Sequence, residues 1–387
     1  MKRFFNSPDS AAGGQQTMRR FSFFADAGCG RQTMRQFSFI PGAGCGRHTM
    51  KKLLSSLLCL SLLAGMAGIC GCQAKPETEP TDDNVFVIGF SQVGSESDWR
   101  VANTKSMTDT FTGDPEYELV MENARQMQEN QFTEVRRFIL EGVDMIIIAP
   151  TVEEGWLTVL TEVHDAGIPV IIMDRSVAVW DDNLYLTNVG SDFLRQGNLA
   201  VEWLEKETLK DAENGDESED GTVRILHLQG TLGATAQIQR TKALEDAVTS
   251  HGNWELISQL DGDFTEAKAY EVMTTYLAEN RDIDVIYSEN DNMTFGAMRA
   301  LDEAGISYGE GGQVRIITFD ATKEALQYCL DGKINLCVEC NPLFGPQVKE
   351  LIEAYRRGDT IPKHVYVNET AYTAKDLTQE FVDTREY

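Results

Sequence analysis

The sequence predicts an α/β protein built from two doubly wound parallel-sheet lobes. Short, nearly continuous apolar runs recur from residue 85 onward, as expected for strands that are buried on both faces of a parallel sheet. Each run is followed by a segment with helical periodicity, so strands and helices alternate along the chain. Because a single sheet of that extent would be unusually large, we expect two units of about 100–150 residues each.

The individual elements can be placed from these runs. The clearest strands are VFVIGF (85–90), MIIIAP (145–150), VIIMD (170–174), RILHLQG (224–230), VIYSEN (285–290) and VRIITFD (314–320). Helices are expected over 130–142, 241–252 and 292–305. Gly142, Gly167 and Gly305 stand where a helix C-cap would favour glycine.

The composition excludes several classes of protein. The chain has 387 residues, of which 42% are hydrophobic and 25% charged, so neither a disordered chain nor a polytopic membrane protein is expected. Asp and Glu number 61 against 34 Lys and Arg, which gives a net charge of −27. A surface this acidic repels nucleic acid, and no nucleic-acid partner is expected. Eight cysteines are too few for a disulfide-dense scaffold.

A basic leader precedes the acidic body. Residues 1–49 contain the direct repeat QTMRRFSFFADAGCGR and QTMRQFSFIPGAGCGR, which is too short and too rich in Gly and Arg to be a folded repeat unit. We interpret 1–49 as upstream read-through and place the natural start at Met50, because an export signal normally comes first. The alternative is a genuine N-terminal domain.

Residues 50–72 have the organisation of an export signal. Lys51 and Lys52 precede an uncharged apolar stretch that ends in Ile-Cys-Gly-Cys. This end resembles a bacterial lipobox, with Cys72 as the lipidated residue. An uncleaved membrane anchor is the alternative. Residues 73–84, rich in Pro, Glu and Thr, predict a flexible stalk that holds an extracytoplasmic domain off a membrane.

Polar side chains follow the ends of several predicted strands. Ligands of doubly wound sheets bind at these carboxyl ends. Arg donates to hydroxyls, Asp accepts from them and Asn does both, so the set suits a small, neutral ligand with many hydroxyls. Each residue taken alone is equally well explained as a turn or helix cap. The residues are Asp174, Arg175, Arg240, Asn290 and Asp320.

Two aromatic residues lie near these positions. Trp99 lies in a Ser-, Gly- and acid-rich loop, and Phe264 follows a strand. Either could stack on the apolar face of a sugar ring, although packing is the commoner role of such residues. No phosphate-loop, dinucleotide or hydrolase motif is present, and neither a cofactor nor a metal is expected. Cys337 and Cys340 lie in a strand-like run that would direct them to opposite faces.

Several sequence blocks together indicate a family. They are GFSQVGSESDWR (89–100), IAPTVEEGW (148–156), DRS (174–176), LQGTLGATAQIQR (228–240), GDFTEAK (262–268), NDNM (290–293), TFD (318–320) and VECNPLFGP (338–346). With these blocks the chain resembles the ribose-type periplasmic sugar-binding proteins of ABC transporters, and within them the galactofuranose-binding branch. The resemblance runs from about residue 85 to the C-terminus.

The resemblance implies a fold and a set of site residues. Two lobes, 85–188 plus 341–370 and 189–340 plus 371–387, would be joined by a three-crossing hinge, as in type I periplasmic binding proteins. The implied sugar-binding residues are Ser97, Asp98, Trp99, Arg100, Asp174, Arg175, Arg240, Phe264, Asn290, Asp320 and Glu339. Asp98, Gln239 and Glu339 depart from the family pattern, which leaves the particular sugar open.

The resemblance also implies a role. The protein would be a monomer that captures a monosaccharide and delivers it to ABC permease subunits, outside the cytoplasm and tethered to the membrane by lipid, with no enzymatic activity. A receptor subunit that feeds a membrane sensor or chemoreceptor is the main alternative. Sugar-responsive repressors share the fold but carry a DNA-binding module where this chain has an export signal. A glycan-cleaving lipoprotein would need a pair of catalytic acids, for which Asp174 and Asp320 are the candidates.

Overall fold

The computed structural model describes residues 85–215 and 220–387. All of them belong to one contact unit that runs from Thr78 to Tyr387. The predicted read-through segment 1–49, the lipoprotein signal 50–72 with Cys72, and the stalk 73–84 lie outside the described residues. None of the helices within 85–215 and 220–387 combines the length and the apolar character that a membrane span requires.

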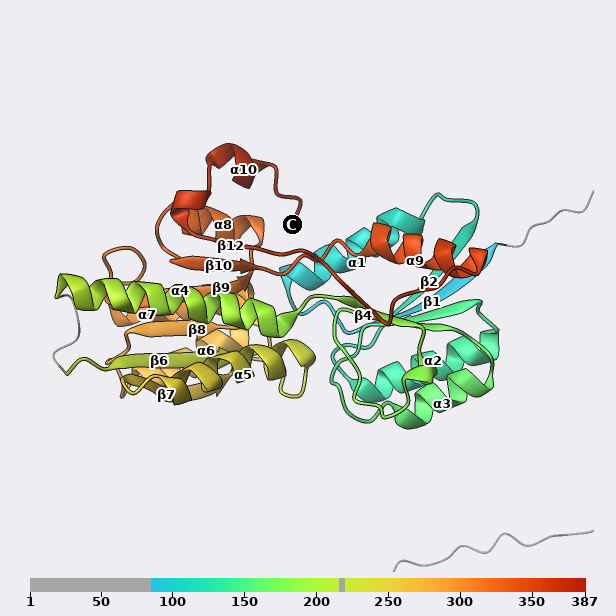
Figure 1. The fold of residues 1–387 in the computed structure, drawn as a ribbon, viewed down its shortest axis with the longest axis horizontal. Helices are drawn as coiled ribbons and strands as arrows, with labels where there is room; N and C mark the ends of the chain where they lie inside the picture. The colour runs from blue at the N-terminus through green and yellow to red at the C-terminus, as the bar shows by residue number, and fades with distance from the viewer. Residues whose placement is uncertain (1–84, 216–219) are drawn as a thin grey trace, which may run out of the picture. The chain divides into compact units, whose positions relative to one another are not determined.

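The first sheet has six strands, with helices on both faces (Figure 1). Its strands are β1 (Phe86–Gln92), β2 (Tyr117–Asn123), β3 (Met145–Ile148), β4 (Val170–Met173), β5 (Thr187–Gly190) and β11 (His364–Tyr366). The helices of this lobe are α1 (Asp98–Phe111), α2 (Gln128–Glu141), α3 (Leu157–Asp165), η1 (Asp182–Leu184) and α9 (Gly345–Arg357). Helix α1 packs with α9, and α2 packs with α3.

The second sheet repeats this plan. Its strands are β6 (Val223–Gln229), β7 (Trp254–Asp261), β8 (Val285–Ser288), β9 (Arg315–Asp320), β10 (Leu336–Glu339) and β12 (Ala371–Tyr372). Its helices are α4 (Phe193–Asn214), α5 (Thr235–Ser250), α6 (Glu266–Leu277), α7 (Asp291–Ala304), α8 (Lys323–Leu330), η2 (Ala374–Asp376) and α10 (Gln379–Asp383). Helix α4 packs with α5, and α6 packs with α7.

The two sheets have matching strand orders. The first runs β11-β5-β4-β3-β1-β2 and the second β12-β10-β9-β8-β6-β7. Within the described residues every strand pairing is parallel except that of β12 with β10. The chain passes between the sheets after β5, after β10 and after β11. The predicted pair of doubly wound lobes joined by three crossings is therefore confirmed.

Alternating side chains of the central strands explain the three-layered packing of each lobe. In β3, Met145 and Ile147 belong to one buried cluster, while Ile146 and Ile148 belong to another that packs against α2 and α3. Successive side chains of a strand point to opposite faces, so a strand covered on both sides is rich in apolar residues on both faces. This is why the continuous apolar runs located the inner strands.

The helix ends also follow the sequence. Gly142 and Gly305 cap α2 and α7 in the left-handed conformation, with φ of 70° and 66°. The prediction was wrong about where α5 begins. We expected a helix from residue 241, whereas α5 starts at Thr235 and carries Arg240 in its second turn. The run Thr-Ala-Gln-Ile-Gln has sufficient helix propensity to extend the helix toward the strand.

Candidate functional site

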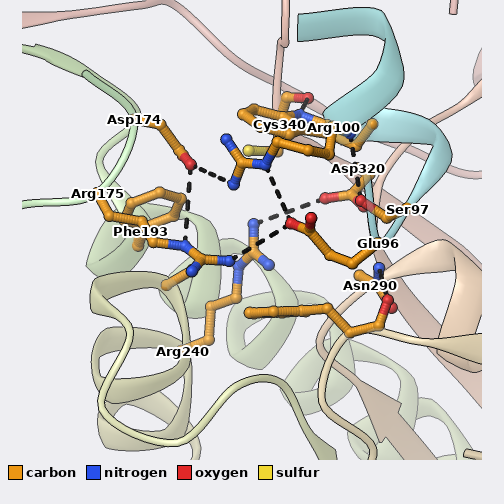
Figure 2. Close-up of a pocket in the computed structure, with 13 residues that line it drawn as sticks. Glu96, Ser97, Arg100, Asp174, Arg175, Phe193, Arg240, Asn290, Asp320 and Cys340 are labelled. Carbon is orange, nitrogen blue, oxygen red and sulfur yellow. Dashed lines mark hydrogen bonds and ion pairs between the residues drawn. The ribbon is translucent and has the colours of Figure 1, made fainter. Parts of the chain in front are cut away.

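A cavity lies where the carboxyl ends of strands from both sheets face each other (Figure 2). Its empty volume is about 310 Å³. Nine of its lining residues were named from the sequence: Ser97, Trp99, Arg100, Asp174, Arg175, Arg240, Phe264, Asn290 and Asp320. The structure thus brings together side chains that are separated by more than two hundred positions in the chain.

The loop between β1 and α1 forms one wall. Ser97 is the N-cap of α1, and its hydroxyl accepts a hydrogen bond from the Arg100 backbone N–H at 3.2 Å. The Arg100 guanidinium pairs with Glu96 Oε1 at 3.0 Å and with Asp174 Oδ2 at 2.7 Å. Burial lowers the pKa of Arg100, but the carboxylates of Asp174 and Glu96 outweigh it, and the net effect raises the pKa above its usual value.

Arg175 leaves donors directed into the cavity. Its Nη1 donates to the carbonyl of Thr151 at 2.7 Å, and its guanidinium stacks on the Phe264 ring of the other lobe at 5.3 Å from the centroid. Nε and Nη2 lie 3.9 Å from Asp174 and Glu96, too far for direct hydrogen bonds. Burial, followed by the nearby Arg100, lowers the pKa of Arg175. Further acceptors brought by a ligand would therefore stabilise this side chain.

The backbone at Asp174 is held in an uncommon conformation. Its φ is 65°, in the left-handed region that a residue with a side chain rarely adopts. Gly190 on the neighbouring β5 permits this arrangement, because a Cβ atom there would lie 2.5 Å from the Asp174 carbonyl oxygen. Strained backbone of this kind often marks a binding site, and here it directs the Asp174 carboxylate toward Arg100.

Arg240 and Asp320 come from the second sheet. The Arg240 guanidinium packs over the Phe319 ring at 4.5 Å and lies 3.9 Å from Asp320 Oδ1. Asp320 has a φ of 109° and a side chain that is only 7% exposed. Burial and the neighbouring Asp291 carboxylate raise the pKa of Asp320 well above its usual value. In its protonated form this carboxyl group donates a hydrogen bond as well as accepting one.

Asn290 is the N-cap of α7. Its Oδ1 accepts from the Met293 backbone N–H at 2.9 Å, and its Nδ2 donates to the Phe264 carbonyl at 3.2 Å. The second contact fixes the loop that carries the Phe264 ring. Asn290 therefore has the cap role that we weighed as an alternative, and it also lines the cavity.

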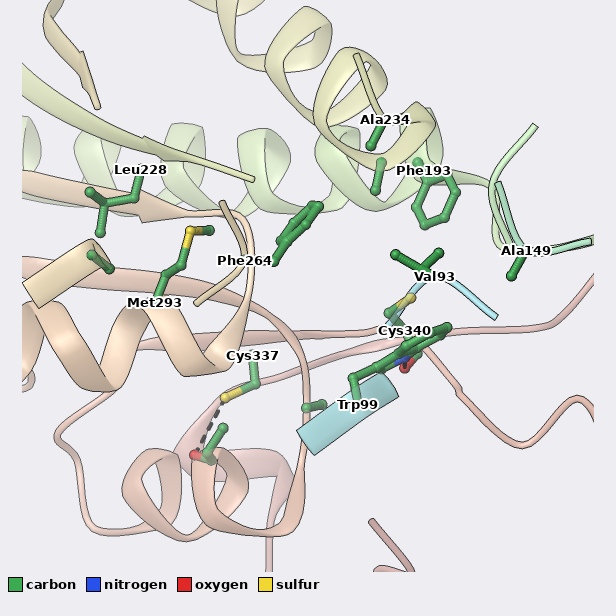
Figure 3. Close-up of a cluster of buried hydrophobic side chains, with 14 of the residues drawn as sticks. Val93, Trp99, Ala149, Phe193, Leu228, Ala234, Phe264, Met293, Cys337 and Cys340 are labelled. Carbon is green, nitrogen blue, oxygen red and sulfur yellow. Dashed lines mark hydrogen bonds between the residues drawn. The ribbon is translucent and has the colours of Figure 1, made fainter. Parts of the chain in front are cut away.

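Trp99 lines the cavity but is largely buried. It is 5% exposed, its Nε1 donates to the Cys340 carbonyl at 2.7 Å, and its ring packs edge-to-face on Phe344. Figure 3 shows it beside Cys340, within a cluster that also contains Phe193 and Phe264. Trp99 therefore packs in the hydrophobic core and also lines the cavity.

The structure places two of the named residues outside the cavity. Asp98 lies on the exposed surface of α1, where its side chain accepts a hydrogen bond from Asn292. Glu339, at the end of β10, contacts Arg385 at 2.9 Å and the Tyr372 hydroxyl at 3.2 Å. Since successive residues of an extended chain point to opposite sides, Cys340 rather than Glu339 faces the cavity.

Four lining residues were not named from the sequence: Glu96, Phe193, Ala236 and Cys340. Glu96 is the most informative of them, because its side chain is 2% exposed and its Oε2 has no hydrogen-bond partner among the described residues. A buried acceptor without a partner is costly, so this oxygen is a strong candidate to receive a ligand hydroxyl. The sequence offered one sign of this role, which is that Glu96 lies four residues before Arg100, a spacing at which the two side chains can pair. It was missed because an acidic residue in a polar loop is usually expected to face solvent.

The cavity suits a neutral ligand with several hydroxyl groups. Three guanidinium groups and three carboxyl groups line it, and Phe264 offers an aromatic face among them. Within residues 85–215 and 220–387, no group of three or more His, Cys, Asp or Glu side chains could hold a metal ion. Arg and carboxyl groups of this kind bind and orient a ligand without any requirement for a reactive centre.

Comparison with known proteins places these observations in a family. The periplasmic binding protein domain model matches residues 88–343. The galactofuranose-binding protein YtfQ of Escherichia coli K12 is 35% identical over 303 residues, which cover 78% of this chain and 91% of that protein.

Solved structures agree with this match. The binding-protein component of the arabinose ABC transporter from Shewanella sp. ANA-3, bound to L-arabinofuranose, is 35% identical, with a TM-score of 0.70, and the match covers 78% of this chain and 95% of that one. A Mycobacterium smegmatis protein in complex with β-D-fucofuranose is 36% identical, with a TM-score of 0.69 and coverage of 75% and 92%. These relatives are binding proteins and not enzymes. The chain belongs to the periplasmic binding protein family.

Proposed function

We propose that this protein captures a monosaccharide in its furanose form outside the cytoplasm and delivers it to an ABC permease. The observation that carries the proposal is the buried cavity in which Arg100, Asp174 and Arg175 of one lobe face Arg240 and Asp320 of the other. Relatives that are 34–36% identical bind galactofuranose, L-arabinofuranose and β-D-fucofuranose according to their descriptions.

The lining of the cavity supports a single sugar ring, because donors and acceptors from both lobes converge around one aromatic face. The Phe264 ring offers a face to the apolar C–H groups of a sugar, while the surrounding guanidinium and carboxyl groups exchange hydrogen bonds with its hydroxyls.

Lobe closure is the mechanism that this proposal entails. The moving bodies would be the two lobes, and the first crossing would follow Gly190, the end of β5, rather than residue 188. The lobes already touch beside the cavity, where Glu153 N–H donates to the Gly233 carbonyl at 3.0 Å and Ser176 N–H donates to Thr235 Oγ1 at 2.7 Å. A sugar that contacts both walls stabilises this closed arrangement by its differential affinity for it, and the permease then recognises the closed form.

The anchor is a further part of the proposal. Membership of the family implies an extracytoplasmic location, and lipidation at Cys72 would tether the domain to the membrane surface. In cells that export lipoproteins, a Cys72→Ser variant should be released from the membrane fraction and lose incorporation of a labelled fatty acid. Retention of the variant in the membrane fraction with unchanged labelling would contradict the anchor.

Calorimetry with purified protein tests the ligand. The panel consists of galactose, arabinose, fucose, ribose and glucose, together with synthetic galactofuranosides. We expect one sugar to bind at micromolar affinity or tighter, and a free sugar selected as its furanose minority to show a weaker apparent affinity than a locked furanoside. Failure of every sugar to bind would overturn the proposal.

A further inference from the structure

The three chain crossings between the lobes meet at one carboxylate. Glu369 lies on the third crossing, between β11 and β12. Its Oε1 accepts a hydrogen bond from Ser191 Oγ on the first crossing at 2.6 Å and from the Asn341 backbone N–H on the second crossing at 2.8 Å. One side chain therefore joins all three segments that must bend when the lobes move.

The other oxygen of this carboxylate leads toward the cavity. Glu369 Oε2 accepts from Gln196 Nε2 at 2.6 Å. Gln196 is fully buried on α4, and its Oε1 accepts from Arg240 Nε at 3.0 Å and from Arg240 Nη2 at 2.7 Å. Since the amide must donate to a carboxylate at one end and accept from a guanidinium at the other, its orientation is fixed by its partners.

The hydrogen-bond donors around Glu369 require an acceptor at this position. The charged and titratable groups near Glu369 are Arg240 and the Cys340 thiol. Asp192, Arg195 and Tyr366 line a surface pocket that Glu369 also lines. Ser191 Oγ also lies 3.4 Å from Cys340 Sγ, at the cavity edge. The hydrogen bonds from Ser191, Gln196 and Asn341 all require an acceptor, and an ionised carboxylate supplies one for each.

We propose that Glu369 is a positioning residue that couples the hinge to ligand binding, because it ties the three crossings together and orients Arg240 through Gln196. This inference rests on the proposed function, in which Arg240 binds the sugar. Any rotation of the lobes that separates the crossings removes donors from Glu369, and loss of Glu369 frees Gln196 to turn away from Arg240. The hinge and the binding side chain thus share one hydrogen-bonded chain.

Protonation of Glu369 would weaken its hydrogen bonds to Ser191, Gln196 and Asn341. Burial raises the pKa of Glu369, and its hydrogen bonds with Ser191, Gln196 and Asn341 oppose the rise. A raised pKa means that the carboxylate is lost at a higher pH than for an exposed Glu as acid is added. Ligand affinity should accordingly fall on acidification, and the part of that fall due to Glu369 should vanish in a Glu369→Gln variant.

A double-mutant cycle tests the coupling on the intact chain. Glu369→Gln replaces an acceptor with a donor at nearly constant shape, and Gln196→Met removes the amide while keeping the volume. Each single variant should weaken sugar binding about ten-fold by calorimetry, and the double variant should be no weaker than the worse single one. Glu118→Gln, on the exposed face of β2, is the matched control and should bind as wild type.

Two outcomes would overturn the inference. If Glu369→Gln binds within two-fold of wild type, or if the two single effects simply multiply in the double variant, Glu369 does not act through Gln196. A second measurement needs no sugar: hydrogen exchange at the Asn341 amide should be about ten-fold faster in Glu369→Gln than in wild type. If wild type binds no sugar, the proposed function and the coupling fall together, and the exchange rate alone shows whether Glu369 clamps the hinge.

Discussion

Asp98 and Asn292 exchange two hydrogen bonds between the two lobes. The Asp98 backbone N–H donates to Asn292 Oδ1 at 3.0 Å, and Asn292 Nδ2 donates to Asp98 Oδ2 at 2.9 Å. Asp98 begins α1 of the first lobe, and Asn292 lies in the first turn of α7 of the second. The two residues therefore join the first lobe to the second from outside the cavity.

Loss of this pair should shorten the lifetime of the closed state. Asn292→Ala removes both hydrogen bonds without altering the cavity lining, so we expect a three- to ten-fold weaker affinity that arises mainly from faster sugar dissociation. Stopped-flow measurement of binding and release checks this. Asn280→Ala is the control, because Asn280 lies shortly before β8, on the side of the amino ends of the strands. The cavity lies at their carboxyl ends. Equal dissociation rates for wild type and Asn292→Ala would show that these two hydrogen bonds do not slow the release of the sugar.

Removal of Arg175 should abolish binding while the fold persists. Its guanidinium contributes the Nε and Nη2 donors that are directed into the cavity and the stacking contact to Phe264. An Arg175→Ala change removes charge-assisted hydrogen bonds worth roughly 1.5–3 kcal/mol each, which corresponds to at least a ten-fold loss of affinity. Arg136→Ala breaks only an exposed ion pair with Glu162 and should bind as wild type. Wild-type affinity in Arg175→Ala, with an unchanged circular dichroism spectrum, would remove Arg175 from the site.

The pH dependence of stability should report on Asp320. Its folded-state pKa lies above the unfolded value, so its contribution to stability is fully present below the unfolded pKa and is lost as pH rises through the folded pKa. At pH 7.5 an Asp320→Asn variant should thus unfold about 2–4 °C higher than ligand-free wild type. The difference should shrink as the pH is lowered. Calorimetric scans from pH 4 to 8 measure the difference in unfolding temperature between the two proteins. If that difference widens as the pH is lowered, the pKa of Asp320 is lowered rather than raised by folding.

Most inner strands could be predicted because buried parallel strands are rich in apolar side chains. Strands β1, β3, β4, β6, β8 and β9 were located from apolar runs, whereas the inner strand β5 was missed, because its buried run Thr-Asn-Val-Gly is half polar. The edge strands β2 and β7 were missed, since their exposed faces interrupt the run with residues such as Glu118 and Glu255. The short strands β11 and β12 are defined by their partners rather than by their own sequence.

The part of the candidate site that directly follows central strands could be predicted from the sequence. Polar residues that directly follow central strands, such as Asp174 and Asp320, reach the cavity because parallel strands end at one edge. Glu96 was missed and Asp98 misplaced, although the two are separated by one residue. Which side of a loop faces inward depends on where the next helix begins, and the N-cap at Ser97 decides it. Contacts between lobes, such as those of Glu369, leave no local pattern at all.

Gly230 should be required for the aromatic wall of the cavity. A Cβ atom at this position would lie 2.0 Å from the Phe264 ring, so Gly230→Ala must displace the ring from its place beside Arg175. We expect at least a ten-fold loss of sugar affinity with a smaller effect on stability, because the clash is with one side chain that lines the cavity. Gly252→Ala is the matched control, because a Cβ there meets none of the described atoms within 4 Å. Calorimetry on both variants decides the matter: equal affinities would mean that the Phe264 ring can shift without cost and contributes nothing to ligand binding.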